Sequence, residues 1–436
     1  MEPTTLPGFR DFYPELTALR THIFAAWRRV AERYGFEEYD GPPLEPLDLY
    51  TRKSGEEIVG QLYAFEDRGG RQVALRPEMT PTLARMVAAR AAALKKPIRW
   101  YAMPQLFRYE RQQRGRLREH FQLNVDLIGE SGPLADAEVV AVAIDVMRAV
   151  GLSAREVQAR ISDRRVLRAM LARRCGLGDA AMPAAFAAID KSERADRDAL
   201  LAGMARRGLT VRESEAVLEV AAVRSLEAVR EVLGPDAAEL ESLEGCVEAL
   251  DAMGLAEFVT VDLTIVRGLA YYTGVVFELF DTGRTMRAIC GGGRYDGLLQ
   301  SLGGVDLPGV GFGMGDVVLG DMLTERGWTA SRPTRLDVFL VGVTEADRPE
   351  VLRLAHGLRD AGVRTEFALK PQSVVKQLKL AAARPARWAM VVGPDERSRG
   401  RTMLRDLRTG TEREIAMDIG ALKAAVAHAD PAEELS

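Results

Sequence analysis

The sequence predicts an α+β protein with two domains, the first of which contains a helical insertion. Three observations lead to this fold class. Short strand patterns with period-two apolar residues are separated by longer helical patterns over the first 327 residues. From about Arg165 to Leu233, alanine, leucine and charged residues dominate and β-branched runs are few, which indicates helices. Beyond a linker at about Trp328 to Thr334, strand and helix patterns alternate, which predicts a small domain built on a mixed sheet.

The first elements follow from apolar spacing and turn residues. Apolar residues recur every three or four positions from about Glu15 to Tyr34, which predicts a helix that Gly35 ends. The proline-containing segment 39–50 cannot form a central strand, because proline lacks the amide hydrogen that the ladder needs. Next, the turn Asp67-Arg68-Gly69-Gly70 predicts a hairpin between strands at 63–65 and 73–75.

Further elements follow along the chain. Thr80 before Pro81 is typical of a helix N-cap, and helices are expected over 134–150 and from Ser242 to Met253. The alternation at Val261, Leu263 and Ile265 and the run 275–280 predict an antiparallel pair bent at Gly268. In the second domain we expect helices over 346–361 and 372–383 between strands.

Composition limits the class of protein. The chain has 436 residues, 47% hydrophobic and 28% charged, which is typical of a soluble globular enzyme with two or three domains. No apolar run of about 18 residues is present, and the first 15 residues do not resemble a signal peptide. We therefore expect a cytoplasmic protein with no membrane segment. Cys175, Cys246 and Cys290 are far from the few histidines, which argues against disulfides and a zinc site, so we name no metal-ligating residue.

The segment 107–122, FRYERQQRGRLREHFQ, has the strongest chemical character in the chain. Alternation predicts two strands joined by a loop over Gln112 to Gly115, so that Arg108 and Arg116 converge on one ligand. A guanidinium binds phosphate through two hydrogen bonds, and the nearby Glu110 could accept a hydrogen bond from a base amine. The segment therefore suggests a nucleotide site; the alternative is a solvated surface hairpin whose charges pair with each other.

Four motifs together resemble a known family. FRYER with the following GR is similar to motif 2 of class II aminoacyl-tRNA synthetases, and LRPEMT at Leu75, RGLAYYTG at Arg267 and GGGRYDGLL at Gly291 resemble histidyl-tRNA synthetases. The resemblance implies a class II antiparallel sheet flanked by helices in a catalytic domain at 1–327, with the insertion at about 165–233. It also implies an anticodon-binding α/β domain at 335–436, and a homodimer formed through the first helix and the proline segment.

The resemblance further implies a reaction and its residues. Histidine and ATP would form histidyl-adenylate, with Mg²⁺ on the phosphates, and tRNA(His) would accept the histidyl group, with Gln113 and Arg118 as candidate tRNA contacts. The implied catalytic residues are Arg108 and Arg267. The implied ATP-binding residues are Arg108, Glu110, Arg116 and His120. The implied histidine-binding residues are Glu78, Thr80, Arg108, Gln122, Asp126, Arg267, Tyr271 and Tyr272.

The chain departs from the family at motif 3. Where the family usually has Gly-Leu-Glu-Arg, this chain has Gly-Asp-Val-Val at 315–318, so the arginine that grips the γ-phosphate is replaced by Val318. Either Arg114 or Arg294 could compensate, or the chain no longer uses ATP as a substrate. The second possibility leaves an alternative open: the histidine-binding, non-catalytic regulatory subunit of ATP phosphoribosyltransferase, which resembles these synthetases.

Overall fold

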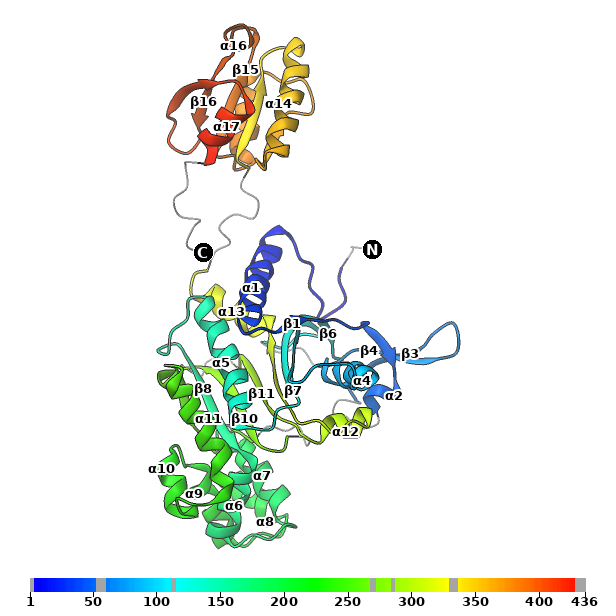
Figure 1. Ribbon diagram of the computed structural model, residues 1–436, viewed down its shortest axis with the longest axis vertical. Helices are drawn as coiled ribbons and strands as arrows, with labels where there is room; N and C mark the ends of the chain where they lie inside the picture. Colours follow the sequence, from blue (N-terminus) through cyan, green and yellow to red (C-terminus); the bar gives the residue numbers. More distant parts are fainter. Residues whose placement is uncertain are drawn as a thin grey trace. The chain divides into compact units, whose positions relative to one another are not determined.

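The computed structural model describes residues 4–51, 60–110, 115–266, 272–283, 287–328 and 336–427. It divides into two compact units, Met1–Thr329 and Ala330–Ser436, each with its own sheet (Figure 1). No helix in these described ranges is long and apolar enough to cross a membrane.

The first unit is built on one large sheet. Its described strands follow the order β1-β5-β7-β12-β11-β10-β8-β9, with β6 pairing the start of β7. Most neighbours are antiparallel, as the class II resemblance implies, whereas β1–β5 and β8–β9 are parallel. The strands are β1 Glu37–Glu38, β5 Ile98–Ala102, β6 Gln105–Phe107, β7 Glu119–Ile128, β8 Val157–Asp163, β9 Val259–Val261, β10 Val275–Asp281, β11 Cys290–Arg294 and β12 Gly309–Gly315.

Helices cover both faces of this sheet. One face packs its apolar side chains, such as Leu123 and Val125, against α1 (Pro14–Arg33), α5 (Pro133–Ala149), α11 (Glu241–Ala252) and α13 (Asp316–Glu325). On the other face, Ile128 and Val276 pack with α4 (Thr80–Arg90) and α12 (Leu298–Gly303). Gly35 follows α1 with a φ of 72°, as its predicted role at the helix end requires.

A small sheet lies beside α4. Its order is β2-β4-β3, with β2 Leu44–Pro46, β3 Tyr63–Glu66 and β4 Gln72–Leu75, and α2 (Asp48–Thr51) follows β2. The predicted hairpin is confirmed, because Asp67 accepts hydrogen bonds from the backbone N–H groups of Gly69 and Arg71 across the turn. The proline-containing strand β2 lies at the edge, where a missing amide hydrogen is tolerated.

One strand prediction is wrong. Val261 ends β9, which runs parallel to β8, and β10 pairs with β8 and β11 rather than with the segment around Leu263 and Ile265. The physical reason is Asp262, whose carboxylate accepts hydrogen bonds from both the backbone N–H and the hydroxyl of Thr264. Such a turn ends the strand, although the apolar residues after it are still buried. Gly268, the expected bend, lies outside the described residues.

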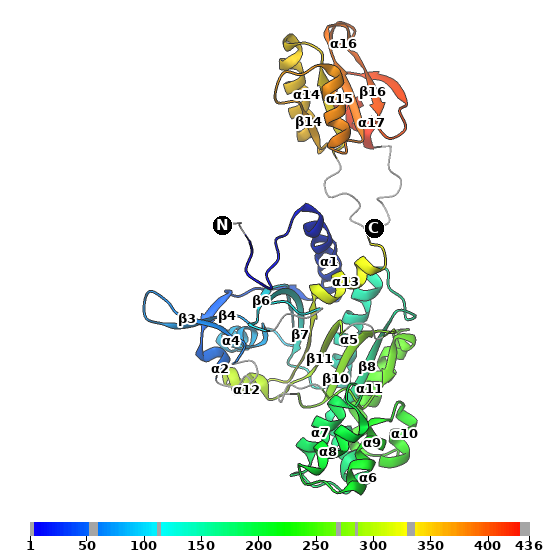
Figure 2. The same cartoon turned by 180° about the vertical axis from the view of Figure 1, so that it is seen from behind.

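Short helices fill the segment between β8 and β9. They are α6 Arg164–Cys175, α7 Met182–Lys191, α8 Arg197–Ala205, α9 Val211–Ala221 and α10 Leu226–Leu233, with the single turns η1 Ala238–Leu240 and η2 Ala256–Phe258 near α11. Several have strong N-caps: Asp163 begins α6, and Thr210 forms a capping box with Glu213 at the start of α9. These helices, drawn in green, lie together at one end of the unit in both views (Figures 1 and 2).

The second unit has a mixed sheet, as predicted. Its order is β14-β13-β15-β16-β17, in which β13 is parallel to β14 and β15 and the last two pairs are antiparallel. The strands are β13 Val338–Gly342, β14 Thr365–Phe367, β15 Trp388–Val392, β16 Arg401–Asp406 and β17 Glu412–Ala416. The helices are α14 Arg348–Asp360, preceded by the turn η3 Glu345–Asp347, α15 Val374–Ala383, α16 Pro394–Arg399 and α17 Ile419–Ala427.

Candidate active site

The candidate site is a cavity of about 470 Å³ over the middle of the large sheet. All the predicted site residues that the structure describes line it, and they come from separate parts of the sequence. They are Glu78, Thr80, Arg108, Glu110, Arg116, His120, Gln122, Asp126 and Tyr272. Two further predicted residues, Arg267 and Tyr271, lie outside the described residues, as does Gln113.

Alternation along β7 supplies one wall of the cavity. His120, Gln122, Asn124 and Asp126 point into the cavity. The residues between them, such as Val125, point the other way into the core against α1 and α5. One face of β7 therefore packs apolar side chains into the core, and its other face presents polar side chains to the cavity at a regular spacing.

Glycines in β12 make room for these polar groups. A side chain at Gly313 would place its Cβ 2.8 Å from the amide carbon and nitrogen of Gln122. At Gly311 the Cβ would come 2.2 Å from Oδ1 of Asp126 and 2.7 Å from the backbone oxygen of Val125. The glycine-rich segment 308–315 thus permits close packing around the cavity.

The side chains of Glu78 and Arg108 lie close together just before the first residue of α4. Arg108 Nε donates to the carbonyl oxygen of Pro77 at 2.9 Å, which holds the guanidinium beside the buried Glu78. Burial raises the pKa of Glu78, and the positive charge of Arg108 opposes this shift. Thr80 is the first residue of α4 and Met79 is its N-cap, so the predicted capping role of Thr80 is wrong.

The base of the arginine-rich hairpin lies within the described residues, whereas residues 111–114 do not. The described ladder joins 105–107 to 119–121, and a hydrogen bond from Arg108 N–H to the Arg118 carbonyl oxygen at 2.9 Å continues it. Past the ladder, Arg116 Nε lies 2.7 Å from Glu110 Oε2, so Arg116 and Glu110 reach the cavity as an ion pair. Arg118 instead stacks on the Tyr109 ring, 4.3 Å from its centroid, and does not line the cavity.

Asp126 is held by a residue that sequence reasoning missed. The hydroxyl of Tyr295 donates a hydrogen bond to Asp126 Oδ1, and both side chains are buried. Burial raises the pKa of Asp126 to about 7, although the Tyr295 hydrogen bond opposes the shift. A single chain gives no signal for this pairing, because the two residues are 169 positions apart.

His120 carries no charge near neutral pH. Burial and the positive charges of Arg108, Arg10 and Arg116 lower its pKa to about 3. A neutral imidazole among arginines presents a flat ring without adding to their repulsion.

Comparison with known proteins identifies the family. A family model described as histidyl-tRNA synthetase matches residues 8–315, and one described as anticodon binding domain matches residues 337–427. The curated histidine–tRNA ligase of Opitutus terrae is 45% identical over 417 residues, which cover 94% of this chain and 95% of that protein. The chain belongs to the histidyl-tRNA synthetase family.

Other relatives agree over nearly the whole chain. The curated histidine–tRNA ligase of Haloarcula marismortui is 37% identical and covers 94% of both chains. The crystal structure of histidyl-tRNA synthetase from Nostoc sp. PCC 7120 superposes with a TM-score of 0.84 at 25% identity, covering 98% of this chain and 99% of that one.

The motif 3 departure of this chain has a structural role of its own. Asp316 begins α13 and accepts a hydrogen bond from the backbone N–H of Phe121 at 2.9 Å. It also lies 3.0 Å from Arg10, which binds Glu119 in turn. Asp316 therefore ties α13 to β7, while Val318 lines the cavity without contributing any charge.

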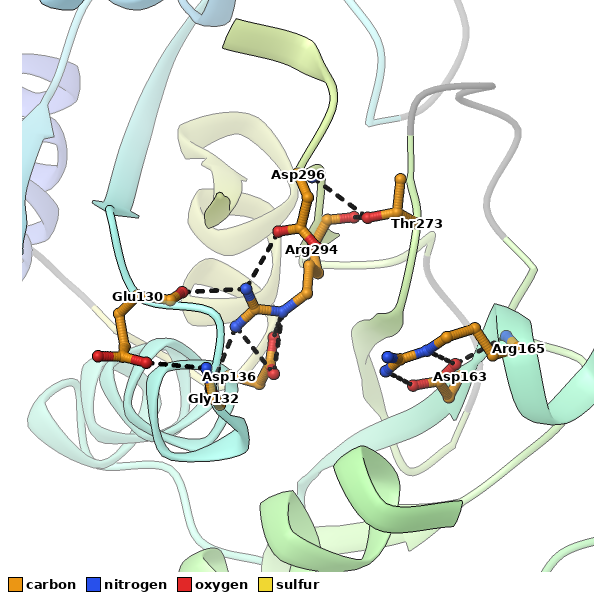
Figure 3. A network of polar contacts seen from close by, with 8 residues as sticks. All are labelled: Glu130, Gly132, Asp136, Asp163, Arg165, Thr273, Arg294 and Asp296. Atoms are coloured by element: carbon orange, nitrogen blue, oxygen red, sulfur yellow. Dashed lines mark hydrogen bonds and ion pairs between the residues drawn. The ribbon is translucent and has the colours of Figure 1, made fainter. Parts of the chain in front are cut away.

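Arg294 does not replace the missing arginine. Its guanidinium is 2% exposed and bonds to the carboxylates of Asp136 and Asp296 and to the carbonyl oxygens of Glu130 and Gly132 (Figure 3). These hydrogen bonds hold the guanidinium between Asp296 and the start of α5, and Arg294 does not line the cavity, so the expectation that it could compensate is wrong. The other candidate, Arg114, lies outside the described residues.

The cavity also contains polar residues that sequence reasoning did not select. Besides Tyr295 they are Gln61, Asn124, Arg194, Glu278 and Arg287. Strand parity could have indicated Asn124, since it lies two residues from Gln122 and from Asp126 on β7. Arg194 could not have been found in this way, because it comes from the helical segment between β8 and β9.

Proposed function

We infer that this protein is a histidine–tRNA ligase, which activates L-histidine with ATP and transfers the histidyl group to tRNA(His). The observation that carries the inference is the meeting of Glu78, Arg108 and Asp126 in one cavity. Glu78 lies at the start of a helix, Arg108 in the hairpin and Asp126 inside a strand. Acidic groups and an arginine that can bind phosphate therefore line the same cavity. The 45% identity to a curated histidine–tRNA ligase over nearly the whole chain supports the same reading.

Histidine would bind at the Asp126 end of the cavity. As a carboxylate, Asp126 would accept a hydrogen bond from the imidazole N–H, and Tyr295 keeps it oriented. A buried acceptor of this kind discriminates strongly, because a substrate without the matching donor leaves it unpaired. The amino group would meet Glu78 and Thr80, and Gln122 and Tyr272 would complete the pocket.

ATP would bind along the hairpin. By the family resemblance, Arg108 holds the α-phosphate, Glu110 the adenine amine and Arg116 the phosphate tail. The neutral His120 would stack on the base. Arg267, the second proposed catalytic residue, would stabilise charge at the reacting phosphate.

The chemistry requires positioning more than a protein nucleophile. A carboxylate oxygen of histidine attacks the α-phosphorus, the bond from that phosphorus to the bridging oxygen breaks, and pyrophosphate leaves with the electron pair. In the second step, a ribose hydroxyl of tRNA attacks the carbonyl carbon of the adenylate, releases its proton and displaces AMP. The histidine carboxylate is already ionised near neutral pH, so the arginines contribute by orienting both substrates and stabilising developing charge.

Magnesium would accompany ATP. Mg²⁺ bound to ATP neutralises phosphate oxygens, and proteins usually hold it through one or two carboxylates plus the phosphates. The cavity fits this requirement, since the carboxylate of Glu278 is among the groups that line it. No group of three potential metal ligands occurs among the residues that the structure describes.

The partners follow from the two matched regions. Residues 337–427 match an anticodon-binding model, so this unit would contact tRNA. A homodimer would bury the N-terminal apolar residues, because Leu6, Tyr13 and Leu16 are 69%, 68% and 48% exposed in the single chain. Sedimentation of the purified protein tests this assembly.

The regulatory-subunit alternative is less well supported. Val318 favours it, because a protein that does not use ATP as a substrate needs no arginine at that position. The match of residues 337–427 to an anticodon-binding model and the retention of Arg108 and Glu110 in the cavity favour the ligase.

Exchange of pyrophosphate into ATP tests the function. We expect exchange that depends on histidine and on no other amino acid, and an Arg108→Ala change should reduce it by at least about 100-fold, since a charge-assisted contact to phosphate contributes about 1.5–3 kcal/mol and orientation adds to it. Arg207→Ala on the exposed surface of the helical segment is the matched control. Binding of histidine without exchange, together with capture of a phosphoribosyltransferase, would instead support the regulatory subunit.

A further inference from the structure

The family's γ-phosphate arginine is absent, yet its place in the cavity is well defined. Val318 stands at that position in α13 and lies against the hairpin: a Cβ built on Gly115 would be 3.1 Å from Val318 Cγ2. Gly115 is followed directly by Arg116, the residue proposed for the phosphate tail. The end of the tail is therefore expected close to Gly115 and Val318.

A different arginine reaches this place. The same built Cβ on Gly115 would lie 4.0 Å from Cδ of Arg287, so Arg287 and Val318 flank one glycine. Arg287 lies just before β11 and lines the cavity together with Arg116 and Val318. Its side chain is exposed within the cavity rather than packed in the core, so its guanidinium can reach a ligand there.

The helical segment adds a second arginine, and the structure shows how it is positioned. Glu193 Oε2 accepts from Arg160 Nη1 at 2.8 Å and its other oxygen accepts from Nη2 at 2.5 Å, which forms a two-point ion pair. Arg160 is buried on β8 and is also bonded to Asp262. This anchor fixes the chain at 193 above the sheet, and the next residue, Arg194, lines the cavity.

The electrostatics of the three arginines favour an anion between them. Burial and the positive charges of Arg116 and Arg194 lower the pKa of Arg287, whereas the charge of Glu110 opposes this shift. Glu110 is already paired with Arg116 at 2.7 Å. Three guanidinium groups around one small space repel each other, and a bound polyphosphate would relieve that repulsion.

We propose that Arg287, with the support of Arg194, binds the terminal phosphates of ATP in place of the motif 3 arginine that this chain lacks. The proposal rests on the inferred ligase function and adds a residue to it. It also gives the helical segment a part in nucleotide binding, through the Glu193 anchor.

Calorimetric titration of ATP and AMP into the full-length protein tests the proposal. For Arg287→Ala we expect ATP affinity to fall about 10- to 100-fold with AMP affinity unchanged, because AMP lacks the terminal phosphates. Arg194→Ala should weaken ATP binding by about 3- to 10-fold. The ATP affinity of Arg287→Lys should lie between those of the wild type and Arg287→Ala, because lysine keeps the positive charge but lacks the paired N–H donors of the guanidinium. Arg207→Ala is the control, and unchanged AMP affinity shows that each variant is folded.

Two results would overturn the proposal. ATP affinity within twofold of the wild type in Arg287→Ala would show that the terminal phosphates bind elsewhere. An equal loss of AMP and ATP affinity would show a general effect on the cavity. Failure of the ligase function is distinguishable from both, since it would appear in the wild type as absence of histidine-dependent pyrophosphate exchange.

Discussion

At the scale of single residues, Asp126 couples histidine binding to pH. Its pKa is raised to about 7 by burial, so the carboxylate that would accept the imidazole N–H is protonated as the pH falls below neutral. We therefore expect histidine affinity to fall about tenfold between pH 8 and pH 6 from this group alone. The histidine KM in pyrophosphate exchange, measured at each pH, gives the profile.

The substrate imidazole also titrates in this range, so a reference is needed. Asp126→Asn keeps the side-chain size and cannot ionise, and its profile should retain only the contribution of the substrate. Parallel pH profiles of the histidine KM for the wild type and Asp126→Asn would show that Asp126 does not change its protonation state in this pH range. That result would contradict the prediction.

Gly313 permits the proposed histidine contact of Gln122. A Cβ at this position would lie 2.8 Å from the Gln122 amide carbon and nitrogen, and the flexible end of a side chain can move away. We expect Gly313→Ala to raise the KM for histidine about 3- to 10-fold by displacing one hydrogen-bonding group, with little change in the KM for ATP. Gly178→Ala is the control, because no atom lies within 4 Å of its built Cβ. A histidine KM equal to that of the wild type would place Gln122 outside the histidine site.

At the scale of secondary-structure elements, the ion pair of Arg294 and Asp136 joins the end of β11 to the first turn of α5. Both side chains are buried, at 2% and 1% exposure, so removal of one partner leaves an uncompensated charge in the core. We expect Arg294→Met to lower the free energy of unfolding in urea by about 3–5 kcal/mol. It should also weaken histidine binding, because the neighbouring Tyr295 orients Asp126.

The matched control for this pair is a double variant. Arg294→Met with Asp136→Leu removes both charges and should recover part of the lost stability, since the remaining groups are apolar. If the double variant lost as much free energy of unfolding as the two single variants together, the two side chains would not be coupled. The loss in Arg294→Met would then come from packing around β11.

Most of the fold and of the site could be predicted from strand periodicity and from the order of the motifs. The family resemblance selected His120, Gln122 and Asp126, and the alternation of β7 explains why they share one face, since the period of a strand depends only on local geometry. The same reasoning failed after Val261, because the carboxylate of Asp262 ends the strand in a turn while the apolar pattern continues. Contacts across long sequence distances, such as Tyr295 with Asp126, leave no local pattern to read.

At the scale of the whole molecule, the chain consists of two units with separate hydrophobic cores. The first unit centres on the large sheet and its helices, and residues such as Leu340, Leu354 and Trp388 form an independent core in the second. Adenylate formation would need only the cavity of the first unit, whereas recognition of tRNA would use both. The two half-reactions can therefore be separated experimentally.

Truncation after Trp328 provides that separation, because each unit buries its own apolar residues and the cut falls between the two sheets. We expect the fragment 1–328 to keep histidine-dependent pyrophosphate exchange within about tenfold of the full chain. Transfer to tRNA should fall by more than 100-fold, since a lost domain interface with RNA removes several phosphate contacts at once. Exchange reports adenylate formation alone and filter-bound histidyl-tRNA reports both steps, so equal losses in the two assays would show that the second unit supports the catalytic fold instead of binding tRNA.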